Sequence, residues 1–183
     1  MVNTIKENLI YDLGKVVLSK CKTVKEAVDF LKDYNIPSGF NDYLLFADVS
    51  GDSIVIEWID DKMKIIVKEE DKNYQIATNY WLTNTELGGY PCERYIKVEN
   101  LLSQNEPTQK LCVQALEENK QDWEEGDTLY SNVYNLTDRT VNVYLRGNMT
   151  DCYVLNSKKI FDMMEKGEEL SEKLDGQKLK SDH

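Results

Sequence analysis

The fold of this chain is constrained most by a series of short strand-like segments joined by turns of hairpin length. Apolar or alternating residues favour strands at residues 43–47, 53–59, 63–68 and 74–78. The first three are separated by turns of only a few residues, rich in Asp, Ser and Gly. Parallel neighbours need a much longer crossover, so connections this short predict an antiparallel meander.

Helical patterns lie on both sides of this meander. Thr23 has the identity of an N-cap residue, and Glu26 lies three residues later as its capping-box partner. We expect helices at residues 3–20, from residue 24 onward, at 93–103 and at 108–119, and further strands at 128–135, 140–146 and 152–155. This order predicts an α+β domain with helices outside antiparallel sheet.

The length of 183 residues is sufficient for one hydrophobic core. We expect a single domain over residues 1–160 and a frayed helix or disorder over the charged tail at 161–183. The formal net charge of -11 disfavours binding to nucleic acid or to an anionic membrane, because phosphate groups repel such a surface. No secretory leader or membrane span is recognisable, so we expect a cytoplasmic protein.

Histidine and cysteine usage limits the chemistry of the chain. The only histidine is the last residue, His183, which excludes a Ser-His-Asp or Cys-His mechanism and a histidine-based zinc site inside the fold. The four cysteines, Cys21, Cys92, Cys112 and Cys152, form no Cys-x-x-Cys pair. We expect reduced thiols, with the last three as small core residues, and neither a metal nor another cofactor.

Several phrases along residues 15–155 occur in a characteristic order and spacing. They are residues 21–27 (CKTVKEA), 46–53 (FADVSGDS), 55–57 (VIE), 77–80 (ATNY), 93–95 (ERY) and 128–136 (TLYSNVYNL). Together they resemble the linear amide C–N hydrolases, which include choloylglycine hydrolases, penicillin V acylases and isopenicillin N acyltransferases. The likeness is nearer to the acyltransferase-like branch.

The resemblance implies the N-terminal-nucleophile fold, in which two antiparallel sheets lie between helical layers (αββα). In that family the nucleophile is a cysteine exposed by processing as the first residue, and its own α-amino group is the base. An amine with a pKa of about 8 can accept the thiol proton, so the family needs no internal histidine.

Two residues match catalytic positions of the family. Asn79 matches the asparagine whose side chain helps to form the oxyanion hole; the alternative is an asparagine that ends a strand and bonds to nearby backbone. Arg94 matches the arginine that orients the nucleophile; the alternative is a surface arginine paired with a carboxylate such as Glu93 or Glu99.

The other matching positions have less direct roles. Tyr80 and Trp81 belong to a loop that borders the family's substrate pocket, so they are candidates to receive an acyl chain, unless they only pack the loop onto the sheet. Asp48, Gly51 and Glu57 also match, but we interpret them as structural: the first two in a β-turn, and Glu57 as a paired interior carboxylate on the strand face opposite Trp58.

The chain departs from the family pattern at the nucleophile. In the family it lies well upstream of the Thr-Val-x-Glu-Ala helix, whereas here only twenty residues precede Cys21. Removal of Met1 would expose Val2, which has no nucleophilic atom. We therefore expect the C-terminal portion of such an enzyme, incomplete because the N-terminal strands and the nucleophile segment are absent, and inactive alone.

Three hypotheses follow. In the first, the chain is a subunit or fragment completed by a separate nucleophile-bearing chain, and it then acts on small N-acyl amides. In the second, it is a non-catalytic remnant or binding module whose uncovered sheets lead to self-association, as a homodimer in which each copy covers the other. In the third, it is an unrelated α+β binding domain, and strands 43–47, 53–59 and 63–68 would then not share one sheet.

Overall fold

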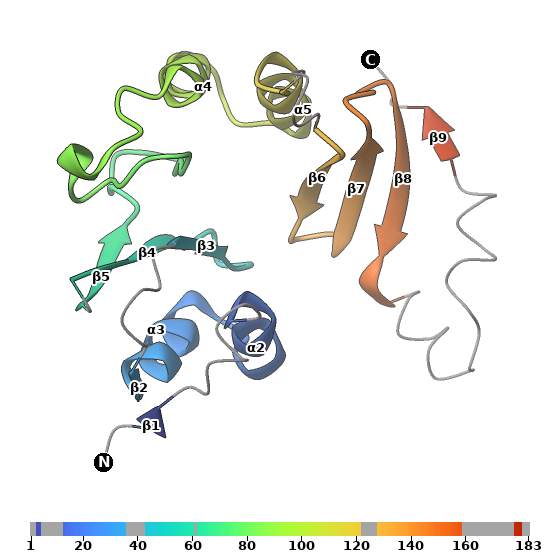
Figure 1. The fold of residues 1–183 in the computed structure, drawn as a ribbon. Coiled ribbons are helices and arrows are strands. Elements are labelled where there is room, and N and C mark those ends of the chain that lie inside the picture. Colours follow the sequence, from blue (N-terminus) through green and yellow to red (C-terminus); the bar gives the residue numbers. More distant parts are fainter. Residues whose placement is uncertain are drawn as a thin grey trace. The chain divides into compact units, whose positions relative to one another are not determined.

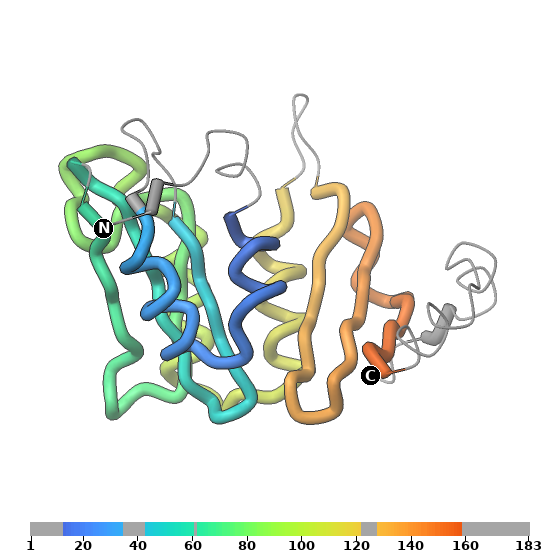
Figure 2. Tube along the Cα trace, turned by 90° about the horizontal axis from the view of Figure 1, so that it is seen from below, coloured from blue at the N-terminus to red at the C-terminus, as the bar shows by residue number. Residues whose placement is uncertain are grey.

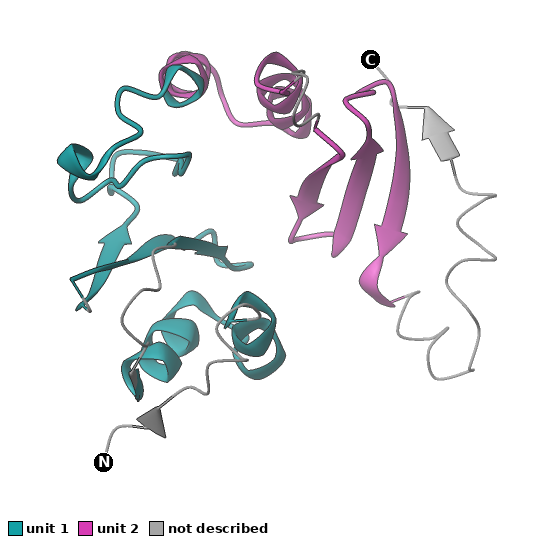
Figure 3. Cartoon of the chain, viewed as in Figure 1, with its two compact units in different colours: residues 1–95 teal, residues 96–183 magenta. Residues whose placement is uncertain are grey.

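The computed structural model describes residues 3–4, 13–35, 43–60, 62–121, 128–158 and 178–180. It separates into two compact units, residues 1–95 and 96–183, which we describe in turn (Figure 3). No helix within the described ranges is long and apolar enough to cross a membrane. The expectation of a single domain over residues 1–160 stays a prediction.

Unit 1 consists of a three-stranded antiparallel sheet with helices before it in the sequence (Figure 1). Its elements are β1 (Asn3–Thr4), α2 (Leu13–Lys20), α3 (Val24–Lys32), β2 (Tyr34–Asn35), β3 (Tyr43–Ala47), β4 (Ser53–Ile59), β5 (Lys62–Val67), η1 (Thr85–Leu87) and the start of α4 (Glu93–Ser103). The antiparallel order β3-β4-β5 confirms the predicted meander, and β1 and β2 form a separate parallel pair. Residues 5–12 of the predicted first helix lie outside the described residues.

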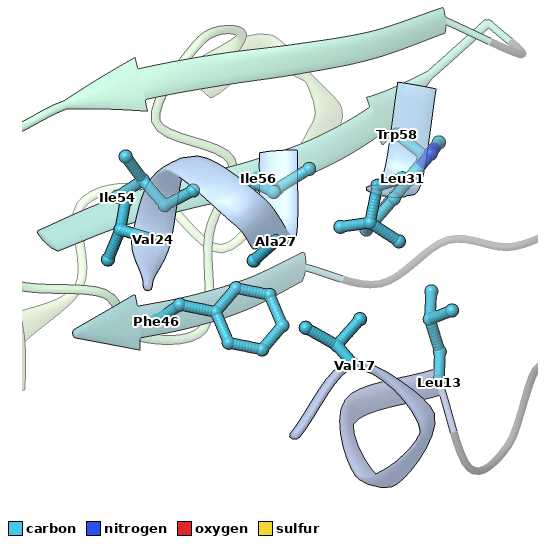
Figure 4. Packing of buried hydrophobic residues seen from close by; sticks show 9 residues of the cluster. All are labelled: Leu13, Val17, Val24, Ala27, Leu31, Phe46, Ile54, Ile56 and Trp58. Atoms are coloured by element: carbon cyan, nitrogen blue, oxygen red, sulfur yellow. The ribbon is translucent and has the colours of Figure 1, made fainter. Parts of the chain in front are cut away.

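The main core of unit 1 lies between the sheet and helices α2 and α3. Ile54, Ile56 and Trp58 alternate along β4 and point toward the helices, as their spacing predicts. Figure 4 shows them packed against side chains from both helices and β3: Leu13, Val17, Val24, Ala27, Leu31 and Phe46. Burial of side chains of this size stabilises the fold by about 1.5–3 kcal/mol each, which fixes this face of the sheet.

The N-terminus of α3 is held by side chains from two parts of the chain. Thr23 Oγ1 accepts a hydrogen bond from the Glu26 N–H at 3.1 Å, which confirms the predicted N-cap. Asp48 Oδ2, from the turn after β3, accepts one from the Val24 N–H at 2.8 Å. Hydrogen bonds from the Ser50 hydroxyl and from this N–H lower the pKa of Asp48. The structural interpretation of Asp48 is thereby confirmed.

Residues 74–78 do not form the fourth strand that the sequence predicts. The segment is held to the sheet by side chains rather than by a backbone ladder. Gln75 Nε2 donates to the Ile66 carbonyl oxygen at 2.9 Å, and the Tyr43 hydroxyl donates to the Thr78 carbonyl oxygen. These long-range bonds replace the pairing that a strand would need, so the prediction was wrong here.

Glu57 lies on the sheet face opposite the main core and anchors the following loop. Its side chain is fully buried. Its Oε1 accepts from the Leu82 N–H at 2.6 Å, and its Oε2 accepts from the Thr83 N–H at 3.1 Å and the Thr83 hydroxyl at 2.5 Å. The interior carboxylate predicted from the sequence is therefore found, with backbone N–H groups and a hydroxyl as its partners.

Unit 2 contains most of α4, then α5 (Gln109–Glu118), β6 (Tyr130–Asn135), β7 (Thr140–Leu145), β8 (Asp151–Asn156) and β9 (Lys178–Lys180). The strands form an antiparallel sheet in the order β6-β7-β8-β9, and β6, β7 and β8 run side by side in Figures 1 and 2. One face packs against α5 through a cluster of side chains: Val133, Tyr144, Met149, Cys152, Val113 and Leu116.

Each unit thus combines helices with an antiparallel sheet, which confirms the α+β class and is compatible with part of an N-terminal-nucleophile fold. The third hypothesis, an unrelated domain, required that β3, β4 and β5 do not share one sheet. They do share one, so the structure gives no support to that hypothesis. Strand β9 lies within the tail for which we expected a frayed helix or disorder. Residues 159–177 and 181–183 of that tail lie outside the described residues.

We expect Glu57→Gln to destabilise unit 1. The carboxamide keeps the shape of the side chain but turns an NH2 group toward buried donors, so at least one N–H of Leu82 or Thr83 loses its acceptor. The free energy of unfolding should fall by about 1–3 kcal/mol in urea denaturation. The control Glu70→Gln changes an exposed side chain and should leave stability unchanged; equal stability of both variants would contradict the anchoring role.

Candidate active site

The structure places Asn79 and Arg94 on either side of one loop of unit 1. Asn79 is exposed and directly follows residues 74–78, the segment that side chains hold to the sheet. Arg94 is half-buried in the first turn of α4. Among the described residues, no side chain or backbone group forms a hydrogen bond or ion pair with the Asn79 carboxamide or the Arg94 guanidinium. The sequence left two alternatives open. One was an Asn79 bonded to backbone, and the other was an Arg94 paired with Glu93 or Glu99. Neither is observed among the described residues.

The two residues are brought together through their main chains at the sulfur of Cys92. The backbone N–H groups of Tyr95, Asn79 and Arg94 lie near the Cys92 Sγ and lower the pKa of its thiol. The Thr78 hydroxyl oxygen is buried and makes no hydrogen bond of ordinary length and angle with a described residue, but the hydroxyl also lowers the pKa of the Cys92 thiol. We call Cys92, Thr78 and these three N–H groups the Cys92 cluster.

The Cys92 cluster is built from the start of a helix and a loop. Cys92 directly precedes α4, so the N–H groups of Arg94 and Tyr95 belong to the first turn, whose donors have no partner inside the helix. The other donors come from Thr78, the last residue of the segment 74–78, and from Asn79, which follows it. A helix begins with a partial positive charge, so this environment favours a thiolate.

The pKa of Cys92 reflects two opposing effects. Burial raises it, because a thiolate loses hydration, while the hydrogen bonds from Thr78, Tyr95, Asn79 and Arg94 lower it by more. The outcome is a pKa of about 7. By contrast, burial raises the pKa of Cys21, with a further contribution from the Glu26 carboxylate, and partial loss of hydration at the sulfur raises that of Cys112, although the residue as a whole is exposed.

A close backbone contact shapes the loop beside Asn79. Gly89 has φ +78°, and a Cβ atom built on it would lie 2.0 Å from the Asn79 carbonyl oxygen. No side chain fits at that distance, so only glycine allows residues 88–90 to approach Asn79 so closely. The position of Asn79 is thus determined by the tether at Thr78 on one side and by Gly89 on the other.

The two aromatic candidates have packing roles in the structure. Tyr80 is 8% exposed, and its ring lies edge-on to Tyr90, with centroids 5.4 Å apart, and to Tyr95, at 5.2 Å. The half-buried Trp81 lies edge-on to Tyr43 with ring centroids 6.0 Å apart. These contacts agree with packing of the loop; that either ring receives an acyl chain stays a prediction.

The cysteine predictions are confirmed only in part. All four thiols are free, and Cys92 and Cys152 are buried as expected, but Cys112 is exposed, so its assignment to the core was wrong. It follows the buried Leu111 on α5, and a helix turns neighbouring side chains to different faces. The unusual environment of Cys92 was also missed; the available signal was its position directly before the predicted helix at 93–103.

Comparison with known families gives one match over most of the chain. The model of the family described as acyl-coenzyme A:6-aminopenicillanic acid acyl-transferase matches residues 10–150. The chain belongs to this acyl-transferase family. The match includes Asn79, Arg94 and Cys92, and it confirms the resemblance that the sequence phrases indicate. No curated protein matches the chain.

We expect a thiol of this acyl-transferase family member to ionise near neutral pH, and Cys92 to be that thiol. The thiolate absorbance in the ultraviolet should rise with a midpoint near pH 7, and Cys92→Ser should abolish that phase. Because the pKa is lowered on folding, native Cys92 binds fewer protons than the unfolded chain between about pH 7 and the ordinary thiol range. The free energy of unfolding of the wild type, relative to that of Cys92→Ser, should therefore increase as the pH rises through that window.

The control for this titration is Cys112→Ser. Cys112 is exposed, and the pKa of its thiol is raised, so this substitution should leave the phase near pH 7 intact. A neutral phase that disappears with Cys112→Ser, or that survives Cys92→Ser, would contradict the assignment.

We expect Gly89→Ala to displace the loop at Asn79, because its Cβ would overlap the Asn79 carbonyl oxygen. The variant should unfold at lower urea concentration, and its thiol phase should shift above pH 7, since the Asn79 N–H moves away from the sulfur. Gly88→Ala is the matched control, because Gly88 also has positive φ (+113°) but nothing lies within 4 Å of its added Cβ. Identical effects of both variants would assign the loss to backbone strain alone.

Proposed function

We propose that this chain supplies the oxyanion donor and the orienting guanidinium of an amide C–N hydrolase or acyltransferase that acts on small N-acyl substrates. The nucleophilic cysteine would come from a segment outside these 183 residues, and the chain alone would be inactive. The observation that carries the proposal is the family match across residues 10–150, which includes Asn79 and Arg94, and the main-chain N–H groups of both residues lie near one sulfur, that of Cys92.

The chemistry assigns one role to each side chain. A thiolate attacks the carbonyl carbon of the N-acyl substrate, and the carbonyl oxygen takes up negative charge. The Asn79 carboxamide, exposed and without a partner among the described residues, donates a hydrogen bond to that oxygen. Arg94 favours the thiolate by its charge. The amine departs with a proton, and water or a second amine then cleaves the thioester.

The environments of Cys21 and Cys92 support an external nucleophile. Cys21 lies between α2 and α3, and burial and the Glu26 carboxylate both raise the pKa of its thiol, which reduces the thiolate fraction. Cys92 has a lowered pKa, but its side chain is 8% exposed and its sulfur already receives the N–H groups of Asn79 and Arg94. Neither arrangement presents an accessible thiolate to an acyl carbonyl.

We expect activity only when the chain is combined with a polypeptide segment of the same family that begins with cysteine. Release of a chromogenic amine from a panel of N-acyl amides measures the reaction. In the combined protein, Asn79→Ala should lower kcat by roughly 10²–10³-fold, because one oxyanion donor is lost. The matched control Asn73→Ala removes an exposed asparagine of the same unit and should leave kcat unchanged.

Two results would overturn this proposal. An inactive combination across the panel would favour the second hypothesis, a non-catalytic binding module. Full activity of Asn79→Ala would retain an enzyme but remove the role of this residue.

A further inference from the structure

Strand β6 forms one end of the sheet in unit 2, with β7 on one side and no described strand on the other. Its hydrogen-bonding pattern determines which main-chain groups are left at that edge. The Arg146 N–H donates to the Leu129 carbonyl oxygen at 2.8 Å, in the same register that pairs Tyr130 with Leu145. Leu129 therefore directs its main-chain groups toward β7.

In an antiparallel pair, successive residues alternate between bonding to the partner and pointing away from it. Ser131, Val133 and Asn135 share the orientation of Leu129 and bond to β7. The intervening residues, Tyr130, Asn132 and Tyr134, direct their N–H and C=O groups to the open edge. No other described residue forms a backbone hydrogen bond with these three.

The side chains on this edge are apolar or neutral. Tyr130 and Tyr134 are 62% and 61% exposed, and the neighbouring Leu129 and Leu145 are exposed as well. Residues 128–137 contain no charged side chain, although 30% of the chain is charged. At the other end of the same sheet, β9 contains Lys178 and Lys180, and charge on an edge strand is a common protection against strand pairing.

We propose that β6 is a dimerisation edge, where two copies of this chain join by antiparallel pairing of β6 with β6 about a two-fold axis at Asn132. This inference concerns assembly and is independent of the proposed acyl chemistry. A two-fold interface requires a surface that is complementary to itself, and the sequence of β6 meets this requirement.

The register follows from the residues that point to the edge. With Asn132 opposite Asn132 of the second copy, Tyr130 lies opposite Tyr134. These are the residues whose main-chain groups face outward, so each can donate one and accept one hydrogen bond across the axis. The same register places the exposed tyrosines in aromatic cross-strand pairs, which stabilise a sheet by roughly 0.2–1 kcal/mol each.

The test measures the mass of the full chain by sedimentation velocity over a range of concentrations. We expect a concentration-dependent dimer for the wild type. Tyr130→Lys combined with Tyr134→Lys places like charges opposite each other and should give monomers. Tyr130→Lys combined with Tyr134→Glu places opposite charges in the same pairs and should restore the dimer.

If repulsion between the net charges of the copies controlled association, the double-lysine variant would dimerise more readily than the Lys–Glu variant. The proposed strand pairing predicts the opposite order, so the experiment separates the two explanations. The lysine pair changes the net charge from -11 to -9, which reduces repulsion between copies, whereas the Lys–Glu pair leaves it at -11. Leu45→Lys on β3, another uncharged strand at a sheet end, is the matched control and should leave the dimer intact. Circular dichroism of all variants confirms that they remain folded.

Hydrogen exchange tests the register without substitution. As the wild-type dimer forms, exchange should slow at the Tyr130, Asn132 and Tyr134 amides but stay constant at Ser131 and Val133, which already bond to β7. A wild-type monomer at all concentrations would overturn the proposal. Equal masses for the two tyrosine double variants, or dissociation by Leu45→Lys, would do so as well.

Discussion

The candidate site depends on a buried carboxylate that holds a loop against the open face of a sheet. Glu57 lies on β4 with its side chain fully buried, and it accepts hydrogen bonds from the backbone of Leu82 and Thr83. Because the carboxylate accepts from donors that would otherwise be unpaired, the loop is fixed without a strand of its own. The tether between Tyr43 and Thr78 then places the next residue, Asn79, beside the start of α4.

Hydrogen-bond donors from two parts of the chain meet at the start of α4. The first turn of α4 has N–H groups without partners in the helix, and the loop contributes the Asn79 N–H and the Thr78 hydroxyl. A neutral thiol is a weak acceptor, whereas a thiolate satisfies all these donors at once, which explains a pKa of about 7 for Cys92 despite its burial. The main-chain N–H groups of Asn79 and Arg94 lie near this sulfur, and their side chains form no hydrogen bond or ion pair with the described residues.

In each of the two larger, antiparallel sheets, the strands at the two ends differ in charge. The β5 and β9 ends contain lysines, while β3 and β6 contain no charge. Uncharged ends with exposed apolar side chains favour pairing with a further strand. In β6, the outward main-chain groups and the neutral side chains occur on the same residues. The edge therefore favours strand pairing in one register over nonspecific association.

Much of the fold follows from the sequence alone, because local periodicity decides it. The apolar run at β3, the alternation at β4 and the helical spacing of α4 predict those elements with their observed bounds, and Thr23 predicts the start of α3. The family phrases likewise identify Asn79 and Arg94 as candidates. These inferences need only residues that are neighbours along the chain.

The remaining features were decided by tertiary contacts. Residues 74–78 have the composition of a strand, but side chains of Gln75 and Tyr43 occupy the backbone groups that a ladder would use. Cys92 has the composition of a core residue, and only the approach of residues 78–79 to the helix start turns it into an acidic thiol. Sequence patterns report which residues can form an element; which donors surround a sulfur or a carboxylate depends on segments far apart in the chain, and folding alone brings them together.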